Sequence, residues 1–537
     1  MQPLLEINNL TVSFGDETAV DGIDLTLNRG QTLVLLGESG SGKSITAMTI
    51  LQILPVAATI TSGQIVLAGQ DLLKKSEEEM CAVRGGQISI IFQEPQTSLN
   101  PVMTIGDQIA ESLRIHKNLT GTAARKQVIA LLDEIGITSA KQRYDDYPHQ
   151  FSGGMKQRVM IAMALACDPV LLIADEPSTA LDVTIQKQVL ELLLKVQQKR
   201  NMAILFITHD LGVAAKMADH VSVMHKGNIV ENASRDVFFT KPSHRYSQAL
   251  FNTLAQGSQV KLTAVKLEKK PEQALLKVTN LDVFFPIRTG ILKTITGHVK
   301  AVKNVSLTLE QGKTTVVVGE SGSGKSSLGK GILQLVSVSG GEVLFDGVDL
   351  MKLTAAQLRQ KRADIQIIFQ DPYSSMNPRM QIGAIIEEGM ILQSNKSAAQ
   401  RLLRIEELLI QVGLEPASRH RYPHQFSGGQ RQRICIARAL AVEPKLIICD
   451  EPTSALDSLF QAQILELLSE LQNKLGLSYL FITHNLAIVE QLADHVIVMY
   501  QGEIVEQGDA KQILHNPQHA YTQQLISAVL PPTIIEE

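Results

Sequence analysis

GESGSGKS at residues 37–44 follows the short apolar run TLVLL and occurs a second time at residues 319–326 of this 537-residue chain. Both copies have the form GxxxxGK[ST], and the apolar run before each copy predicts a buried strand. The glycines allow backbone N–H groups to converge on an anion, and the N-terminus of the following helix adds positive potential. The stretch therefore predicts a strand, a phosphate-binding loop and a helix in succession, which is typical of an α/β fold.

Three further motifs follow each copy in the same order and at the same spacing. They are FSGG at 151–154 and 426–429, Asp-Glu at 175–176 and 450–451, and Thr-His at 208–209 and 483–484. A chain of this length is too long for one hydrophobic core. The repeat predicts two nucleotide-handling domains, 1–254 and 275–537, joined by a linker over 255–274 that has weak periodicity and a Lys-Lys-Pro.

Composition narrows the class of protein. The chain is 44% hydrophobic and 19% charged, which fits soluble globular domains. A formal net charge of −4 and the absence of Trp argue against a nucleic-acid partner. The N-terminus does not resemble a signal peptide, and no apolar stretch approaches the length that spans a bilayer. A role at a membrane would therefore depend on a membrane-embedded partner.

The four cysteines lack the spacing of a metal site. They are Cys81, Cys167, Cys435 and Cys449. We expect buried free thiols in a reducing cytoplasm.

Apolar runs and their periodicity predict the rest of each domain. Runs at 170–174 and 203–207 predict buried strands of a parallel sheet. Apolar residues at i, i+3, i+4 and i+7 predict amphipathic helices that end at Gly136 and Gly413. The second half has extra residues around 288–297, which predict a surface loop or hairpin.

The motifs supply the side chains of a phosphoryl-transfer site in each half. The loop lysine is expected to bridge the β- and γ-phosphates, and the next residue, a serine, to bind Mg²⁺. The Asp that ends the later strand can reach the Mg²⁺ shell, and the Glu after it can polarise the attacking water. The residues are Lys43 and Lys325, Ser44 and Ser326, Asp175 and Asp450, and Glu176 and Glu451.

A histidine and a glutamine complete this set in each half. A lone His after an apolar strand is more often structural, but the matched spacing of His209 and His484 favours a γ-phosphate contact. Gln93 and Gln370 each follow an apolar strand, at a mobile joint, and are expected to contact Mg²⁺ or the water.

Ser-Gly-Gly at the start of a helix offers a hydroxyl and bare backbone N–H groups to a second anion. Ser152 lies far along the chain from Lys43. We therefore expect it to meet the nucleotide held by the other half.

Taken together, these motifs resemble those of ATP-binding-cassette (ABC) proteins with two cassettes fused in tandem, over nearly the whole chain. The resemblance implies two α/β domains, each with a mostly parallel P-loop sheet, an antiparallel β subdomain and a helical subdomain. It also implies that the two cassettes pair head to tail within one chain around two ATP molecules and Mg²⁺. The loops at 179–182 and 454–457 resemble segments that couple the two sites.

The resemblance assigns the site residues to two composite sites. One joins Gly37, Glu38, Ser39, Gly40, Ser41, Gly42, Lys43, Ser44, Gln93, Asp175, Glu176 and His209 to Ser427, Gly428, Gly429 and Gln430. The other joins Gly319, Glu320, Ser321, Gly322, Ser323, Gly324, Lys325, Ser326, Gln370, Asp450, Glu451 and His484 to Ser152, Gly153, Gly154 and Met155. Phe14 and Phe285 stand where the family stacks an aromatic side chain, usually Tyr, on adenine, and Met155 replaces the commoner Gln.

Longer stretches resemble the peptide and nickel importer branch of the family. They are FQEPQTSLNP at 92–101, FQDPYSSMNP at 369–378, YPHQFSGG at 147–154 and 422–429, HRYSQAL at 244–250 and HAYTQQL at 519–525. FPIRTGILK at 285–293 is most similar to the fused ATPases of Yej-type importers, which take up peptides and microcin C. The resemblance implies an ATPase at the cytoplasmic face of the inner membrane, two permease subunits and, indirectly, an extracytoplasmic binding protein.

Two alternatives stay open. The fused ATPase of a glutathione importer is the nearest competing identity. Tandem cassettes also occur in ribosome-associated translation factors, but those have a long, charged helical linker, whereas this linker is short and the chain mildly acidic. Co-purification of membrane permeases or of ribosomes would separate the two classes.

Overall fold

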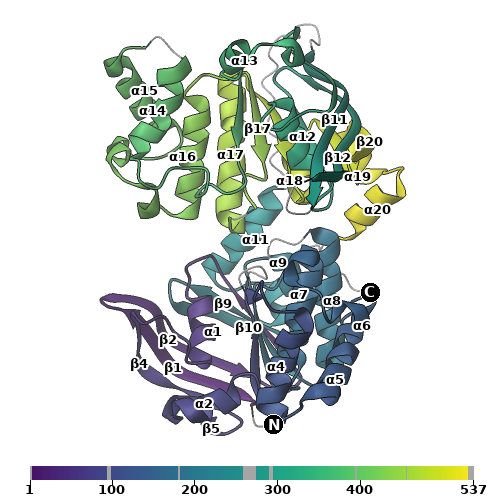
Figure 1. Cartoon of the computed structure of the whole chain (residues 1–537). Coiled ribbons are helices and arrows are strands. Elements are labelled where there is room, and N and C mark those ends of the chain that lie inside the picture. Colours follow the sequence, from purple (N-terminus) through teal and green to yellow (C-terminus); the bar gives the residue numbers. More distant parts are fainter. Residues whose placement is uncertain are drawn as a thin grey trace. The chain divides into compact units, whose positions relative to one another are not determined.

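The structure is a computed structural model that describes residues 3–93, 98–178, 182–257, 274–289, 294–393, 396–454 and 456–529. The chain divides into two compact units, formed mainly by residues up to Leu254 and by residues from Ala255 to Val529 (Figure 1). Each unit has one six-stranded and one four-stranded sheet. Of the predicted linker, residues 258–273 lie outside the described residues, and 255–257 continue a helix.

The larger sheet of the first unit has the strand order β10-β9-β3-β8-β7-β6. The five strands from β9 to β6 in this order run parallel, and the edge strand β10 pairs antiparallel with β9. The bounds are β3 Thr32–Leu36, β6 Ile88–Ile91, β7 Leu171–Asp175, β8 Ala203–Thr208, β9 His220–His225 and β10 Asn228–Ser234. Every residue of β3, β7 and β8 is buried, which explains their continuous apolar runs.

The smaller sheet of the first unit is antiparallel, in the order β2-β1-β4-β5. Its strands are β1 Leu5–Phe14, β2 Glu17–Leu27, β4 Ala58–Leu67 and β5 Gln70–Asp71. Alternate residues of β7 belong to different cores: Leu171 and Ile173 pack with this smaller sheet, and Leu172 packs with the helices.

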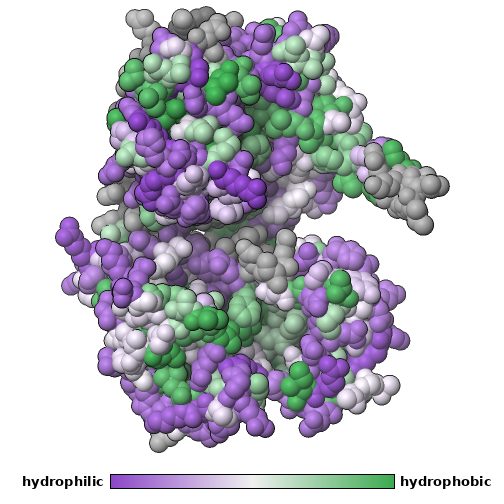
Figure 2. Space-filling model, turned by 60° about the vertical axis from the view of Figure 1, so that its left-hand side comes forward, coloured by the Kyte–Doolittle hydropathy of each residue, from purple (hydrophilic) through white to green (hydrophobic). Residues whose placement is uncertain are grey.

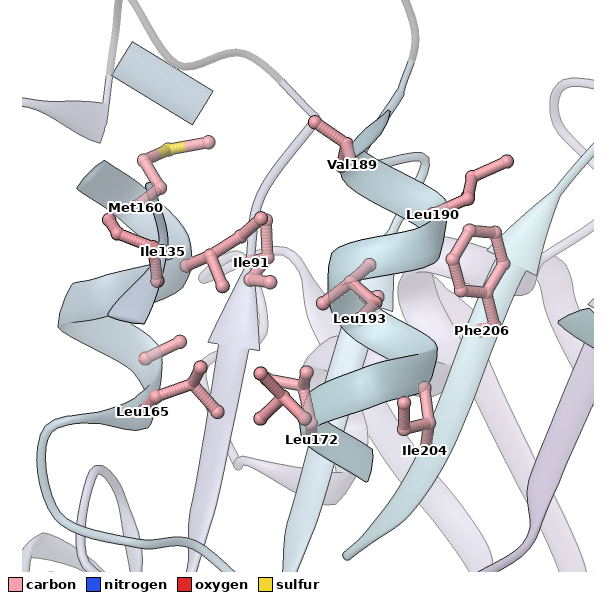
Figure 3. Close-up of a cluster of buried hydrophobic side chains, with 14 of the residues drawn as sticks. Ile91, Ile135, Met160, Leu165, Leu172, Val189, Leu190, Leu193, Ile204 and Phe206 are labelled. Atoms are coloured by element: carbon pink, nitrogen blue, oxygen red, sulfur yellow. The ribbon is translucent and has the colours of Figure 1, made fainter. Parts of the chain in front are cut away.

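Helices cover both faces of the larger sheet. The described helices of this unit are α1 Lys43–Ile50, α2 Glu77–Val83, α4 Ile105–Lys117, α5 Gly121–Glu134, α6 Ala140–Arg143, α7 Gly153–Leu165, α8 Val183–Arg200, α9 Leu211–Met217, α10 Arg235–Thr240 and α11 Arg245–Gly257. Figure 3 shows side chains of α7 and α8, among them Leu165 and Leu193, packed against Leu172 of β7 and Phe206 of β8. This core fixes the helix that begins after Ser152 against the strand that ends at Asp175.

The second unit repeats this plan, with sheet orders β12-β11-β14-β15 and β16-β17-β18-β13-β19-β20. The strands are β11 Ala274–Thr289, β12 Thr294–Glu310, β13 Thr314–Val318, β14 Gly340–Phe345, β15 Val348–Asp349, β16 Ile365–Ile368, β17 Leu446–Asp450, β18 Ser478–Ile482, β19 His495–Tyr500 and β20 Glu503–Asp509. The helices are α12 Lys325–Ile332, α13 Ala355–Lys361, α14 Ile382–Gln393, α15 Ala398–Gln411, α16 Gly428–Leu440, α17 Ser458–Leu475, α18 Leu486–Leu492, α19 Ala510–His515 and α20 Ala520–Ser527.

Most local expectations hold in this structure. The predicted α/β class, with a mostly parallel sheet and an antiparallel sheet in each unit, is confirmed. Gly136 and Gly413 follow α5 and α15 with φ values of 76° and 77°, a left-handed conformation that favours glycine. The extra residues of the second half lengthen β11 and β12, which pair as far as Thr289 and Thr294.

The expectation of buried cysteines is wrong for Cys81. It lies on the exposed side of α2, whereas Cys167, Cys435 and Cys449 are buried. The reason is helical periodicity, because α2 buries Met80 and Val83 on its opposite side.

The surface is mixed in character. On the face shown in Figure 2, hydrophilic side chains predominate on each unit, and separate groups of hydrophobic side chains interrupt them. Within the part of the chain that the structure describes, no helix combines the length and the apolar character needed to cross a membrane.

Candidate active sites

The phosphate-binding loop of the first unit leaves β3 and enters α1. Lys43 starts α1, is only 4% exposed, and donates from Nζ to the carbonyl oxygens of Gly37 (2.9 Å) and Glu38 (2.7 Å). A Cβ atom at Gly37 would lie 2.2 Å from the carbonyl oxygen of Met224. The loop is therefore folded back around the ammonium group, in a space that admits no side chain at Gly37.

The second unit builds the same loop between β13 and α12. Lys325 donates from Nζ to the carbonyl oxygens of Gly319 (2.7 Å) and Glu320 (2.8 Å). Gly319 has φ 150°, and a Cβ atom there would lie 2.2 Å from the carbonyl oxygen of Met499. Burial lowers the pKa of the Lys325 ammonium, because the charged form loses its hydration.

A serine hydroxyl and an aspartate carboxylate meet beside each loop. Ser44 Oγ donates to Asp175 Oδ1 (3.1 Å), and Ser326 Oγ donates to Asp450 Oδ1 (2.7 Å). Burial raises the pKa of both carboxyl groups, since it penalises their charged form. Two adjacent oxygen ligands fit Mg²⁺, which usually takes one or two protein oxygens and completes its shell with phosphates and water.

The glutamate after each aspartate is held by two side chains. Glu176 contacts His209 Nδ1 through Oε1 (3.0 Å) and accepts from Gln93 Nε2 through Oε2 (2.9 Å). Its φ of 45° is left-handed, and its backbone N–H donates to the carbonyl oxygen of Ile207 (3.0 Å). This unusual backbone conformation turns the carboxylate out of the sheet toward residues that follow two other strands, β6 and β8.

The second unit repeats the arrangement around Glu451. Its Oε1 lies 3.2 Å from His484 Nδ1, its Oε2 accepts from Gln370 Nε2 at 2.9 Å, and its φ is 48°. Because both units have this geometry, chance does not explain the arrangement of these groups.

In each unit the contact between Glu and His shifts the pKa of one partner toward its charged form. Burial acts to lower the pKa of His209, but the hydrogen bond and charge of Glu176 outweigh it and the pKa is raised. In the second unit, burial acts to raise the pKa of Glu451, but His484 outweighs it and the pKa is lowered. Glu451 is thus kept ionised, as a general base must be, with lone pairs left for a water molecule.

The two Ser-Gly-Gly segments form helix N-termini. Ser152 Oγ accepts from the backbone N–H of Met155, and Ser427 Oγ from that of Gln430, each at 3.4 Å. Gln430 Oε1 also accepts from the N–H of Ser427 (3.1 Å), completing a capping box that the Met155 side chain cannot form. Met155, where the second unit has Gln430, therefore weakens the start of α7 and leaves the backbone N–H groups of that helix end in place.

The two glycines of each segment have different surroundings. A Cβ atom at Gly153 would meet nothing within 4 Å, so a ligand can approach it closely. A Cβ atom at Gly154 would lie 2.7 Å from Ile185, and one at Gly429 would lie 2.9 Å from Phe460. The second glycine is thus needed for helix packing in both units. Gly153 leaves space for an anion, whereas a Cβ atom at Gly428 would lie 3.6 Å from Leu456.

The remaining predicted site residues lie at strand ends and in loops. Phe14 ends β1, and Phe285 lies on β11 opposite Val299, 38% exposed. Stacking on adenine stays a prediction for both. Of the coupling loops, residues 179–181 and 455 lie outside the described residues, and Asp457 caps α17 by accepting from the N–H of Phe460 (3.1 Å).

One contact to the phosphate-binding loop was missed by the sequence reasoning. The backbone N–H of Glu320 donates to the hydroxyl of Tyr521 (2.9 Å), far along the chain. The signal was present as the His-x-Tyr shared by HRYSQAL and HAYTQQL, which was used only as a mark of the importer branch.

Comparison with known proteins agrees with this geometry. The sequence profile of the ABC transporter family matches residues 20–179 and 302–454. The profile described as the oligopeptide/dipeptide transporter C-terminal region matches residues 505–535.

Three relatives match the chain over nearly its whole length. The Uncharacterized ABC transporter ATP-binding protein YejF of Escherichia coli (strain K12) is 49% identical over 98% of this chain and 99% of its own. The Peptidoglycan transport ATP-binding protein YejF of Agrobacterium fabrum is 46% identical over 100% of this chain and 98% of its own. The Glutathione import ATP-binding protein GsiA of Pectobacterium atrosepticum is 46% identical over 98% of this chain and 89% of its own.

Proposed function

Because the chain belongs to the ABC transporter family, as an ATPase with two fused cassettes, we propose that it powers an importer for oligopeptides or peptide-like compounds. The observation that carries the proposal is the pair of matched sites, each with a loop lysine, a Ser–Asp pair and a glutamate held by His and Gln. The match of residues 505–535 to the oligopeptide/dipeptide transporter C-terminal region supports a peptide cargo.

Each cassette residue has a role that its contacts support. Lys43 and Lys325 bind the phosphates of ATP, which replace the loop carbonyls as partners of the ammonium group. Glu176 and Glu451 accept a proton from the attacking water, and His209 and His484 orient the carboxylates. Because both cassettes keep all these groups, both sites hydrolyse ATP.

Mg²⁺ fits the Ser–Asp pair of each cassette. Ser44 with Asp175, and Ser326 with Asp450, would hold the ion, and Gln93 and Gln370 lie near enough to the glutamates to act on the same water. Bound there, the ion neutralises charge on the β- and γ-phosphates.

The two cassettes pair within one chain, so that the Ser-Gly-Gly of one completes the ATP site of the other. Pairing of tethered partners is governed by effective concentration and not by the protein concentration. ATP turnover per chain should therefore stay constant as the protein is diluted. Turnover that falls on dilution would show that the productive pairing is between chains.

The chain works with two integral-membrane permeases and, through them, an extracytoplasmic binding protein. We place the chain at the cytoplasmic face of the inner membrane. The residues after Gln93 and Gln370 resemble the permease-contacting region of the family.

Cysteine cross-linking tests the permease contact. Ser374 is exposed in the segment after Gln370. In a Cys81→Ser background, which removes the exposed native thiol, Ser374→Cys should cross-link to a permease in membrane vesicles. Gln360→Cys, exposed on α13, is the matched control and should give no product. Products that contain only ribosomal proteins would contradict the importer role and favour a translation factor.

The cargo is either an oligopeptide or glutathione. The glutathione importer relative at 46% identity favours the second, whereas the match of residues 505–535 to the oligopeptide/dipeptide transporter C-terminal region favours the first. Uptake of labelled oligopeptide and of labelled glutathione, measured with the cognate permeases and binding protein, decides between them. A chain that hydrolyses ATP but drives uptake of neither compound would contradict the proposed cargo and leave the ATPase activity unaffected.

A further inference from the structure

The C-terminal segment of the second unit is anchored by a glutamate. Glu506 on β20 accepts hydrogen bonds from the backbone N–H groups of Gln518 (2.8 Å) and His519 (3.1 Å). His519 Nδ1 then accepts from the N–H of Tyr521 (3.2 Å) and so starts α20. Burial acts to raise the pKa of Glu506, but the N–H groups of Gln518 and His519, together with the Thr522 side chain, outweigh it and the pKa is lowered. The turn before α20 is therefore fixed to the strand.

The first unit builds the same anchor. Glu231 on β10 accepts from the backbone N–H groups of Ser243 (2.7 Å) and His244 (3.1 Å), and His244 Nδ1 accepts from the N–H of Tyr246 (3.1 Å). The ring of Tyr246 stacks on His225, with centroids 4.0 Å apart. The same anchor is therefore built in both units from the same residue types.

In the second unit this anchor places a tyrosine under the phosphate-binding loop. Tyr521 is 8% exposed, and its ring lies against Tyr500 with centroids 4.3 Å apart. Its hydroxyl accepts from the backbone N–H of Glu320 at 2.9 Å. Burial raises the pKa of Tyr521, so the hydroxyl is neutral at physiological pH.

The bonded N–H belongs to a peptide group that is held at both ends. The carbonyl oxygen of that group belongs to Gly319 and accepts from Lys325 Nζ at 2.7 Å. Its N–H is the group that donates to Tyr521. A planar peptide fixed at both its donor and its acceptor cannot rotate without breaking one bond, so the tyrosine orients the carbonyl that positions the lysine.

We propose that Tyr521 is a positioning residue of the second ATP site, through which the C-terminal segment 517–527 sets nucleotide affinity. The proposal rests on the proposed function, because it assumes that residues 319–326 bind ATP. Loss of the hydroxyl leaves the loop free to sample other conformations. Nucleotide binding must then also order the loop, and the nucleotide affinity falls. The effect belongs in KM, and not in the hydrolysis step, since Tyr521 contacts neither the Ser–Asp pair nor Glu451 in any described bond.

Tyr521→Phe removes the hydroxyl and keeps the ring. In the full chain, photo-labelling with an azido-ATP analogue, followed by cleavage between residues 257 and 274, reports nucleotide on each half. A net hydrogen bond of this kind predicts about three- to tenfold weaker labelling of the half that contains Lys325. Labelling of the other half and kcat at saturating ATP should stay close to the wild-type values.

Tyr500→Phe is the matched control, because it removes a hydroxyl that accepts from Gln501 and leaves the ring contact intact. Glu506→Gln is a second variant, which loosens the anchor without touching the loop and should weaken labelling of the same half. If both halves of the wild type are labelled and Tyr521→Phe labels the half that contains Lys325 as strongly as the wild type does, the inference about Tyr521 is overturned and the proposed function is not. A wild-type chain that takes up no label on either half overturns the proposed function.

Discussion

Glu176→Gln is expected to lower ATP turnover by about 10²–10⁴-fold, and Glu451→Gln to do the same, because each removes a general base and the two paired sites are expected to turn over together. The amide keeps the size of the side chain and can still accept from Gln93 or Gln370, but it has no charge to take a proton. Steady-state phosphate release is the measurement. The double variant should also retain bound ATP.

The control for this pair is Glu78→Gln, an exposed glutamate on α2 that should leave turnover unchanged. If one single variant keeps wild-type turnover and transport, the two sites are not equivalent, in spite of their matched geometry. A variant that kept only the activity of the untouched site would show that the two sites turn over independently.

Lys43→Met is expected to weaken nucleotide binding to the first half by about 10- to 100-fold, the range for loss of a charge-assisted hydrogen bond. The lysine is buried and bonded to two loop carbonyls, so no solvent-exposed charge can replace it. Half-resolved photo-labelling is the measurement, and Lys325→Met should produce the mirror result in the second half.

Lys74→Met is the matched control, because that ammonium is largely exposed and pairs only at the surface with Asp71 in the described bonds. It should leave both halves labelled as in the wild type. Equal loss from both halves in Lys43→Met would show that nucleotide binding at one site requires nucleotide at the other. Undiminished labelling of the first half would remove Lys43 from the phosphate site.

Both largest effects concern residues at the ends of secondary-structure elements: Lys43 starts α1, and Glu176 follows β7. The sequence could point to Lys43 and Glu176 because the loop motif and the strand-ending Asp-Glu are local signals, read from neighbouring residues alone. The partners of Glu176 come from two other strands, so only their repeated spacing hinted at them. Their distances follow from strand order, which no local pattern encodes.

Three features show where local reading stops. The exposure of Cys81 depends on which side of α2 packs against the unit. The missing capping bond at Met155 is visible only beside its counterpart Gln430. The contact of Tyr521 with Glu320 joins residues far apart in sequence, through a turn held by Glu506.

By itself, the sequence determined that this protein has two α/β cassettes with a phosphate-binding loop, a strand-ending carboxylate pair and a Ser-Gly-Gly helix start in each. These features depend on glycine conformation, apolar periodicity and helix ends, which act over a few residues. Only the tertiary structure decided that each glutamate is clamped by His and Gln, and that a C-terminal tyrosine holds one peptide of the loop. Such contacts arise when packing of the cores brings strand ends and the last helix together, and packing is a property of the whole unit.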